Sequence, residues 1–339
     1  MSILVSILVF GAVIIIHELG HFITAKLSGI KVNEFSIGMG PKLFGRTKNG
    51  TDYCVRAFPI GGYVAMEGED EDSNAEGSFS QVPVQSRIMV VIAGAIMNLI
   101  LGFGVLCILV NMQSSITSLK VSSFYEGAYT EKTGLQVDDE IIAINGRKCY
   151  IANDIIYEFA RTQNGEADFT VIRNGEKKQL DNVTFETYKD DAGNKQMVID
   201  FTVYPIEKTF SGVIKESFRW TVSIARLVFL SLVDLLTGHV AINQMSGPVG
   251  IVSTISDAVS YGIDSVLMIL AMITINLGVF NLLPFPALDG GRLVFLLIEL
   301  FRGKPLNPKY EIFVNTAGMV LLLGFMAFVT FSDITKFFV

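Results

Sequence analysis

The chain has 339 residues, of which 50% are hydrophobic and 17% are charged, and its mean hydropathy is +0.49. Soluble domains carry about 25% charged residues, so this composition argues against a disordered chain and against a wholly soluble globule. The net charge of -7 disfavours a nucleic-acid-binding surface, and no nucleic-acid partner is expected.

Charged residues are absent from four long stretches, which predicts a polytopic α-helical membrane protein with lipid as its surroundings. A spanning helix needs about 20 apolar residues. Three of the stretches reach this length unaided, and the first reaches it only by including His17, Glu18 and His21. The four predicted transmembrane helices are 2–27, 88–111, 265–288 and 312–334.

The distribution of Lys and Arg predicts the orientation of the chain in a cell membrane. Basic residues flank the loop 28–87 and the loop after the third span. Because basic residues favour the cytoplasmic side, both loops are expected there. The termini and the segment between the second and third spans are then extracytoplasmic.

Residues 112–205 are expected to form a separate extracytoplasmic α+β domain. Two β-rich runs, 167–173 and 196–203, alternate with Asn-Gly turns. The stretch 128–146, AYTEKTGLQVDDEIIAING, resembles the signature of a PDZ domain in its circularly permuted bacterial form. PDZ domains bind extended peptide ends by strand addition, so peptide ends are candidate partners. A spacer domain is the alternative.

The segment 206–264 combines an amphipathic helix with a linker. Within 213–237, apolar residues fall on one helical face and polar residues on another. Arg226 and Asp234 would be costly at the middle of a bilayer. The helix is therefore expected to lie in the membrane interface, with spanning as the alternative.

The first predicted span carries the motif HExxH as His17-Glu18-Leu19-Gly20-His21. On a helix, His17 and His21 lie on one face and can bind one Zn²⁺, while Glu18 can reach the water that the ion activates. Ionisable residues within a span are expensive and usually functional. Helix-packing histidines are the alternative.

A catalytic zinc site takes three protein ligands and keeps one position open. Carboxylates at or near the ends of the last two spans are Asp264, Asp289 and Asp333. The predicted orientation brings Asp289 to the same membrane side as His17 and His21. Asp289 also lies in NLLPFPALDGG (281–291), where prolines interrupt the helix and glycines permit close backbone approach.

HExxH in the first span and NxxPxPxLDGG in the third resemble the site-2 protease family of intramembrane zinc metalloproteases, in its bacterial RseP/RasP branch with one PDZ domain. Further similar segments are FPIGGYVAMEGE, SGPVGIV and LDGGRLVFLLIELFRGKPLNP. The resemblance implies that His17, His21 and Asp289 bind zinc and that Glu18 is the catalytic acid/base. It implies a substrate-binding role for Asn281; a helix-packing amide is the alternative. The segment AGAIMN departs from the family, which usually has Gly-Pro where Ala95-Ile96 stand.

The expected reaction is hydrolysis of a peptide bond within the transmembrane segment of a single-span protein. Such a helix must unwind before attack, and its freed backbone groups then need partners. The stretch 51–66 is rich in β-forming residues around Pro59, Gly61 and Gly62, which predicts a membrane-associated hairpin whose edge can pair with substrate. Gly61 and Gly62 are therefore candidate substrate-binding residues, and an ordinary cytoplasmic hairpin is the alternative. The acidic run 67–72 is expected to be a solvated loop.

The family resemblance further implies regulated intramembrane proteolysis, with anti-sigma factors and remnant signal peptides as substrates. Two other classes of function fit the sequence less well. An ion or proton transporter would also carry buried His, Glu and Asp, but it usually shows internal repeats and more spans. A membrane-anchored PDZ scaffold without catalysis would not need HExxH.

Overall fold

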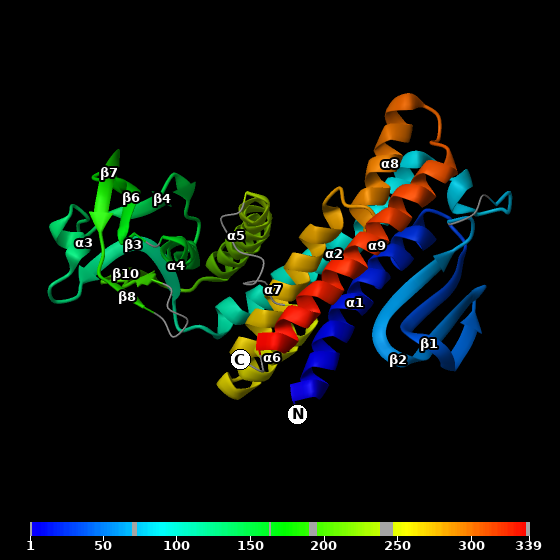
Figure 1. Cartoon of the computed structure of the whole chain (residues 1–339), viewed down its shortest axis with the longest axis horizontal. Coiled ribbons are helices and arrows are strands. Elements are labelled where there is room, and N and C mark those ends of the chain that lie inside the picture. The colour runs from blue at the N-terminus through cyan, green and yellow to red at the C-terminus, as the bar shows by residue number, and fades with distance from the viewer. Residues whose placement is uncertain (1, 70–72, 163, 190–194, 238–246, 337–339) are drawn as a thin grey trace. The chain divides into compact units, whose positions relative to one another are not determined.

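The computed structural model describes residues 2–69, 73–162, 164–189, 195–237 and 247–336 (Figure 1). It divides into two compact units. One consists of Met1–Leu106 with Ile224–Val339, and the other of Cys107–Ser223.

The first unit is a helical bundle with a β-sheet against its first helix (Figure 1). Its helices include α1 (Ser2–Leu27), α2 (Val84–Met112), α6 (Pro248–Tyr261), α7 (Ile263–Leu282), α8 (Asp289–Arg302), α9 (Pro308–Lys336) and the short 3-10 helix η1 (Phe79–Gln81). Among the described residues, four helices are long and apolar enough to cross a membrane: Ser2–Leu27, Val84–Met112, Ile263–Leu282 and Lys309–Thr335. The predicted multi-pass membrane protein with four spanning helices is therefore supported.

Glycines let these apolar helices approach at backbone distance. A Cβ placed on Gly20 of α1 would lie 2.5 Å from the carbonyl oxygen of Ala93 in α2. One placed on Gly278 of α7 would lie 3.0 Å from the carbonyl oxygen of Ala95. Helices surrounded by lipid associate through such close packing, since burial of apolar surface does not distinguish a neighbouring helix from a lipid tail.

The third predicted span and its LDGG motif, 265–300, are two helices rather than one. Helix α7 ends at Leu282 and α8 begins at Asp289. Two prolines in the sequence PFP stand in the break, where they cannot continue a helix. Ala287 in the same turn has φ of +70°, a left-handed conformation that is strained for a residue with a Cβ.

The segment 206–264 contains two helices. Helix α5 (Phe210–Leu236) covers the predicted amphipathic stretch and is not among the candidate spans. The residues predicted as linker include α6, which Pro248 begins in the favoured first position. Asp333 at the end of α9 accepts hydrogen bonds from the backbone N–H groups of Gly247 and Gly250, at 2.8 and 2.9 Å. This carboxylate therefore caps α6 from another part of the chain.

The region between the first two spanning helices forms two long strands, β1 (Val32–Lys48) and β2 (Thr51–Met66), joined by a tight turn. Both strands fold back, so β1 pairs with β2 more than once. Residues 34–37 pair with 62–65 in antiparallel order. They also pair with 52–55, and in that pairing the residue numbers of the two segments increase in the same direction. Residues 42–48 pair with 51–56. The segment 62–66 therefore forms one edge of the sheet and 42–48 the other.

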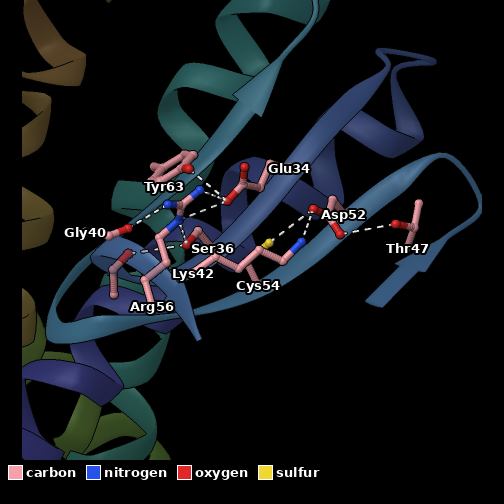
Figure 2. A network of polar contacts seen from close by, with 10 residues as sticks. Glu34, Ser36, Gly40, Lys42, Thr47, Asp52, Cys54, Arg56 and Tyr63 are labelled. Atoms are coloured by element: carbon pink, nitrogen blue, oxygen red, sulfur yellow. Dashed lines mark hydrogen bonds and ion pairs between the residues drawn. The ribbon is translucent and has the colours of Figure 1, made fainter. Parts of the chain in front are cut away.

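The stretch 51–66, predicted to form a hairpin, is thus one half of a larger folded sheet. The turn that joins the two strands of this sheet lies at 48–51 instead of at the Gly61-Gly62 pair. Polar contacts hold the folded sheet together, as Figure 2 shows. The Glu34 carboxylate accepts hydrogen bonds from Arg56 at 2.7 Å and from the Tyr63 hydroxyl at 2.8 Å. Burial opposes ionisation of Glu34, but these hydrogen bonds outweigh it and lower the pKa of that carboxyl.

The second unit is built around an antiparallel sheet in the order β10-β3-β4-β6-β7, with β5 beside β4 and a separate β8-β9 pair. Its elements are β3 (Ile116–Phe124), α3 (Tyr129–Lys132), β4 (Glu140–Ile144), β5 (Arg147–Lys148), α4 (Ala152–Arg161), β6 (Glu166–Arg173), β7 (Glu176–Thr184), β8 (Thr187–Lys189), β9 (Lys195–Met197) and β10 (Phe201–Ile206). The predicted β run 167–173 lies in β6, whereas the run 196–203 is divided between β9 and β10.

Phe169 is the largest fully buried side chain of the second unit's core, and its ring lies 5.7 Å from that of Phe185. Phe169→Ala is expected to cost about 3–5 kcal/mol, because it leaves a cavity that the sheet cannot close. Cys149 is in the same core and is 6% exposed, whereas Cys54 is 3% exposed in the first unit. Thiol labelling of the full chain, read by mass spectrometry, should show that Cys149 reacts at least about 10²-fold faster in Phe169→Ala than in the wild type. Labelling of Cys54 should stay unchanged, and equal acceleration at both thiols would contradict the prediction.

Candidate metal centre

Three predicted residues converge at one point in the first unit. His17 and His21 lie one helical turn apart on α1 and are 8% and 9% exposed. Asp289 is the first residue of α8. The Nε2 atoms of the two histidines are 3.1 Å apart, and Asp289 Oδ2 lies 3.2 Å from that of His17 and 3.4 Å from that of His21.

These separations suit three ligands of one small cation. A tetrahedral zinc ion with its ligands 2.0–2.1 Å away holds neighbouring ligand atoms about 3.3 Å apart. Within the described part of the chain, this trio is the one group of His, Cys, Asp and Glu side chains with the spacing of a metal site. The donor set, two imidazoles and a carboxylate, is also one that catalytic zinc sites use.

The surroundings of the trio favour an ion. Asp289 Oδ2 is buried and, among the described residues, makes no hydrogen bond besides these ion-pair contacts. Gly94 of α2 lies against the two rings. A Cβ there would come within 2.4 Å of His21 Nε2 and 2.8 Å of His17 Nε2. The absence of a side chain at Gly94 therefore keeps the ligand atoms clear.

The remaining nitrogen of each ring faces a polar group of α2. His21 Nδ1 lies 2.8 Å from the carbonyl oxygen of Val90, so it donates its hydrogen there and leaves Nε2 free as an acceptor. His17 Nδ1 lies 3.3 Å from the side-chain amide of Asn98. Reasoning from the sequence overlooked Asn98. The available signal was a polar amide in the middle of an apolar stretch.

The sheet lies beside the same turn of α1. A Cβ on Gly62 would be 3.3 Å from Glu18 Cγ and 2.9 Å from the carbonyl oxygen of Ser36. Gly62 belongs to the edge segment 62–66, so this edge runs next to Glu18. Gly61 has φ of +86° and lies against Met39.

The other predicted residues stand apart from the trio. Asn281 is 8% exposed in the last turn of α7, and its side chain makes no hydrogen bond to the three ligand candidates in the described structure. Asp264 is in the first turn of α7, and Asp333 caps α6. Of the three carboxylates considered as the third ligand, Asp289 is the one that reaches the histidines.

Ion pairs fix the helix that carries Asp289. Arg292, one turn further along α8, pairs with the carboxylate of Glu69 and donates to its carbonyl oxygen at 2.9 Å. Arg87 at the start of α2 forms a bidentate pair with Glu299 of α8, at 2.6 and 3.0 Å. Glu69 belongs to the acidic run predicted to be merely solvated, so that prediction was wrong for this residue; residues 70–72 lie outside the described part.

These ion pairs line a cavity of about 490 Å³ that also includes Phe79 and Leu306. None of the three ligand candidates lines it. It is therefore separate from the metal centre, and the ion pairs in its lining hold α8 in place.

Comparison with known proteins agrees with this geometry. Residues 5–325 match Peptidase family M50. The chain belongs to this family of site-2 proteases. The predicted resemblance is thus confirmed, and the chain is a metalloprotease of a multi-pass membrane type.

Relatives match the whole chain. A Fusobacterium nucleatum protein, provisionally named a zinc metalloprotease, is 35% identical, with 100% of both chains covered. A similarly named Clostridium acetobutylicum protein is 37% identical, covering 98% of this chain and 97% of its own. The regulator of sigma-W protease RasP of Bacillus subtilis is 30% identical, with 99% of both covered.

Gly94→Ala tests the metal centre directly. The added methyl group would occupy the space between the two imidazoles, so bound metal measured by elemental analysis of the purified chain should fall to background. Gly104→Ala is the matched control in the same helix, because a Cβ there meets nothing within 4 Å. It should retain metal and, as a helix-interior Gly→Ala change, gain about 1 kcal/mol of stability. Full metal content in Gly94→Ala would show that the ion lies elsewhere.

Proposed function

We propose that this protein is an intramembrane zinc endopeptidase that cleaves the transmembrane segment of single-span membrane proteins. The observation that carries the proposal is the triangle of His17 Nε2, His21 Nε2 and Asp289 Oδ2, with sides of 3.1 to 3.4 Å. The two histidines come from α1, a candidate membrane span whose apolar sequence would otherwise exclude ionisable groups.

The cofactor is zinc, held by His17, His21 and Asp289. Its chemistry, when bound, is that of a Lewis acid that activates water and polarises the scissile carbonyl. The donor set favours zinc over magnesium or calcium, which prefer oxygen ligands. The zinc metalloprotease names of the relatives support the same assignment.

Glu18 is the general base and acid. It lies between the two histidines in sequence and beside the sheet edge in space. From this position its carboxylate takes a proton from the attacking water and later delivers one to the leaving amine. General acid-base catalysis of this kind contributes about 10²–10⁴-fold to the rate.

The edge segment 62–66 receives the unwound substrate. A transmembrane helix must lose its internal hydrogen bonds before its carbonyl can be attacked, and no water replaces them in the hydrocarbon region. The segment pairs on one side with 32–37, so strand addition on its other side can supply the missing partners next to Glu18. Gly61 and Gly62 keep this edge free of side chains, and Asn281 binds the substrate backbone or the developing oxyanion.

The basic residues of the loops support an orientation with the metal centre near the cytoplasmic face and residues 112–205 outside. We assign the outer sheet unit to the PDZ-like class, because the stretch 128–146 folds as α3 and β4 followed by a turn. Edge strand β10 is the candidate site for peptide ends.

Exposed apolar side chains on the sheet (Phe44, 74%; Phe58, 59%) and on α5 (Phe218, 61%) fit contact with membrane lipids.

The substrate class follows from the site and from one relative's name. The Bacillus subtilis relative is named regulator of sigma-W protease RasP. The family resemblance implies anti-sigma factors and remnant signal peptides, which each offer one membrane-spanning segment for an unwinding site of this kind. Both are proposed as substrates in regulated intramembrane proteolysis.

Glu18→Gln is the decisive variant. In detergent, a reporter with one transmembrane helix between two soluble tags should be cut by the wild type and not by the variant, with a loss of about 10²–10⁴-fold. The variant should keep its zinc, because Glu18 is not among the three ligands. A zinc chelator should abolish cleavage of the reporter by the wild type. A transporter or a scaffold would leave the reporter uncut even as the wild type, and undiminished cleavage by Glu18→Gln would overturn the proposal.

Gly62→Ala tests the sheet edge. Its Cβ would press on Glu18 and on the Ser36 carbonyl, so turnover should fall by on the order of 10²-fold, as expected for a displacement of about 1 Å. Zinc content should not change. Gly11→Ala is the control, because a Cβ at that position of α1 meets nothing within 4 Å. If both variants cleave equally well, the edge segment does not lie against the reacting groups.

A further inference from the structure

Asn98 of α2 presents its side-chain amide to the rear of the His17 ring. The residue is 0% exposed. Its Nδ2 lies 3.3 Å from His17 Nδ1, and its Oδ1 is buried and has no hydrogen-bond partner in the described structure. A buried amide with an unsatisfied oxygen is costly and calls for an explanation.

The chemistry of a metal-bound imidazole supplies one. If His17 offers the Nε2 lone pair to an ion, the neutral ring carries its hydrogen on Nδ1. That N–H requires an acceptor, and the Nδ2 group that faces it is a donor. Two donors would then oppose each other while an acceptor on the same amide remains unused.

Rotation of the amide by 180° removes the conflict. The oxygen and nitrogen of an Asn side chain have nearly the same shape, so either can occupy either position. In the rotated form Oδ1 accepts the Nδ1–H of His17. In the described structure, only the amide NH2 group is then without a partner, whereas the unrotated form with metal-bound His17 leaves the ring N–H, Oδ1 and that NH2 group all unsatisfied.

We infer that Asn98 is a positioning residue for the metal: its Oδ1 accepts a hydrogen bond from His17 Nδ1 and so aims Nε2 at the ion. The inference rests on the proposed role of His17 as a ligand. Metal-ligating histidines almost always donate their second N–H to such an acceptor, which fixes the tautomer and the ring orientation.

The second histidine shows the same arrangement with a different acceptor. His21 Nδ1 lies 2.8 Å from the backbone carbonyl of Val90, an acceptor that no side-chain substitution removes. His17 depends instead on a side chain, two helical turns further along α2. The two ligands of α1 are thus both oriented by α2, but only one of them through a replaceable group.

A role in helix packing is distinguishable from this one. The contact between Asn98 and α7 is made by the backbone carbonyl of Asn98, which accepts a hydrogen bond from Thr274 Oγ1 at 3.1 Å. Any residue at position 98 supplies that carbonyl. The side-chain amide is therefore not needed for the contact with Thr274.

The test compares three variants of the full chain in detergent. Asn98→Leu has a similar size but no acceptor, Asn98→Asp keeps an acceptor oxygen, and Thr274→Val removes only the helix contact. Zinc affinity, measured by competition with a chromophoric chelator, should fall 10–100-fold in Asn98→Leu. It should be retained in Asn98→Asp and in Thr274→Val.

A second readout is the visible spectrum of the cobalt-substituted protein, which reports ligand geometry. The wild-type bands should be altered in Asn98→Leu and restored in Asn98→Asp. Thermal unfolding of each metal-free variant checks the fold. If Asn98→Leu does not fold, Asn98→Ala replaces it in the comparison with Asn98→Asp.

Two results would overturn the inference. One is wild-type zinc affinity in folded Asn98→Leu or Asn98→Ala; the other is an equal loss in Asn98→Asp. Failure of the wild-type chain itself to bind zinc would instead overturn the proposed function together with the inference, so the two failures are distinguishable.

Discussion

Two imidazoles and a carboxylate can meet here because the apolar helices α1, α2 and α7 approach at backbone distance and α8 begins just after the end of α7. Lipid offers no alternative partner for such groups, so they must satisfy one another or bind a metal. Gly20 and Gly94 let α1 and α2 pack without intervening side chains, and Gly278 does the same between α2 and α7. A single Cβ at Gly94 would already occupy the space where the ligand atoms meet. The metal centre therefore depends on helix packing as much as on the ligands themselves.

In the proposed function, the folded sheet serves a different purpose, which is to bind the substrate. A helix opened for cleavage exposes backbone groups that need hydrogen bonds immediately, and an edge strand offers a row of them. The sheet can hold an edge beside Glu18 because its interior is fixed independently, by the Glu34 carboxylate bound to Arg56 and Tyr63. A rigid platform also limits the entropy lost when substrate is ordered on it.

The metal centre could be predicted from the sequence because ionisable residues are energetically costly within an apolar stretch and are therefore a sign of function. Ionisable residues in apolar stretches stand out, and the helical spacing of His17 and His21 leaves one geometry for a shared ion. The β1 strand was not predictable, since 32–48 contains glycines and lysines and its pairing is set by residues far along the chain. Helix α6 was missed for a similar reason, because its cap is Asp333, more than eighty residues away. Asn98 was missed because an amide in an apolar run looks like a packing residue until its neighbour is known.

The break between α7 and α8 explains why the proposed third ligand is an aspartate at a helix start. A carboxylate in the middle of a continuous span would face a closed backbone with no free N–H groups. At the first residue of α8, Asp289 instead stands where the helix dipole favours negative charge. The break itself is enforced by close contacts: a Cβ on Gly290 would lie 1.9 Å from the Leu283 carbonyl oxygen, and Gly318 of α9 packs against Pro286. The strained turn at Ala287 persists because these contacts over-determine it, and the carboxylate is thereby delivered to a fixed point facing α1.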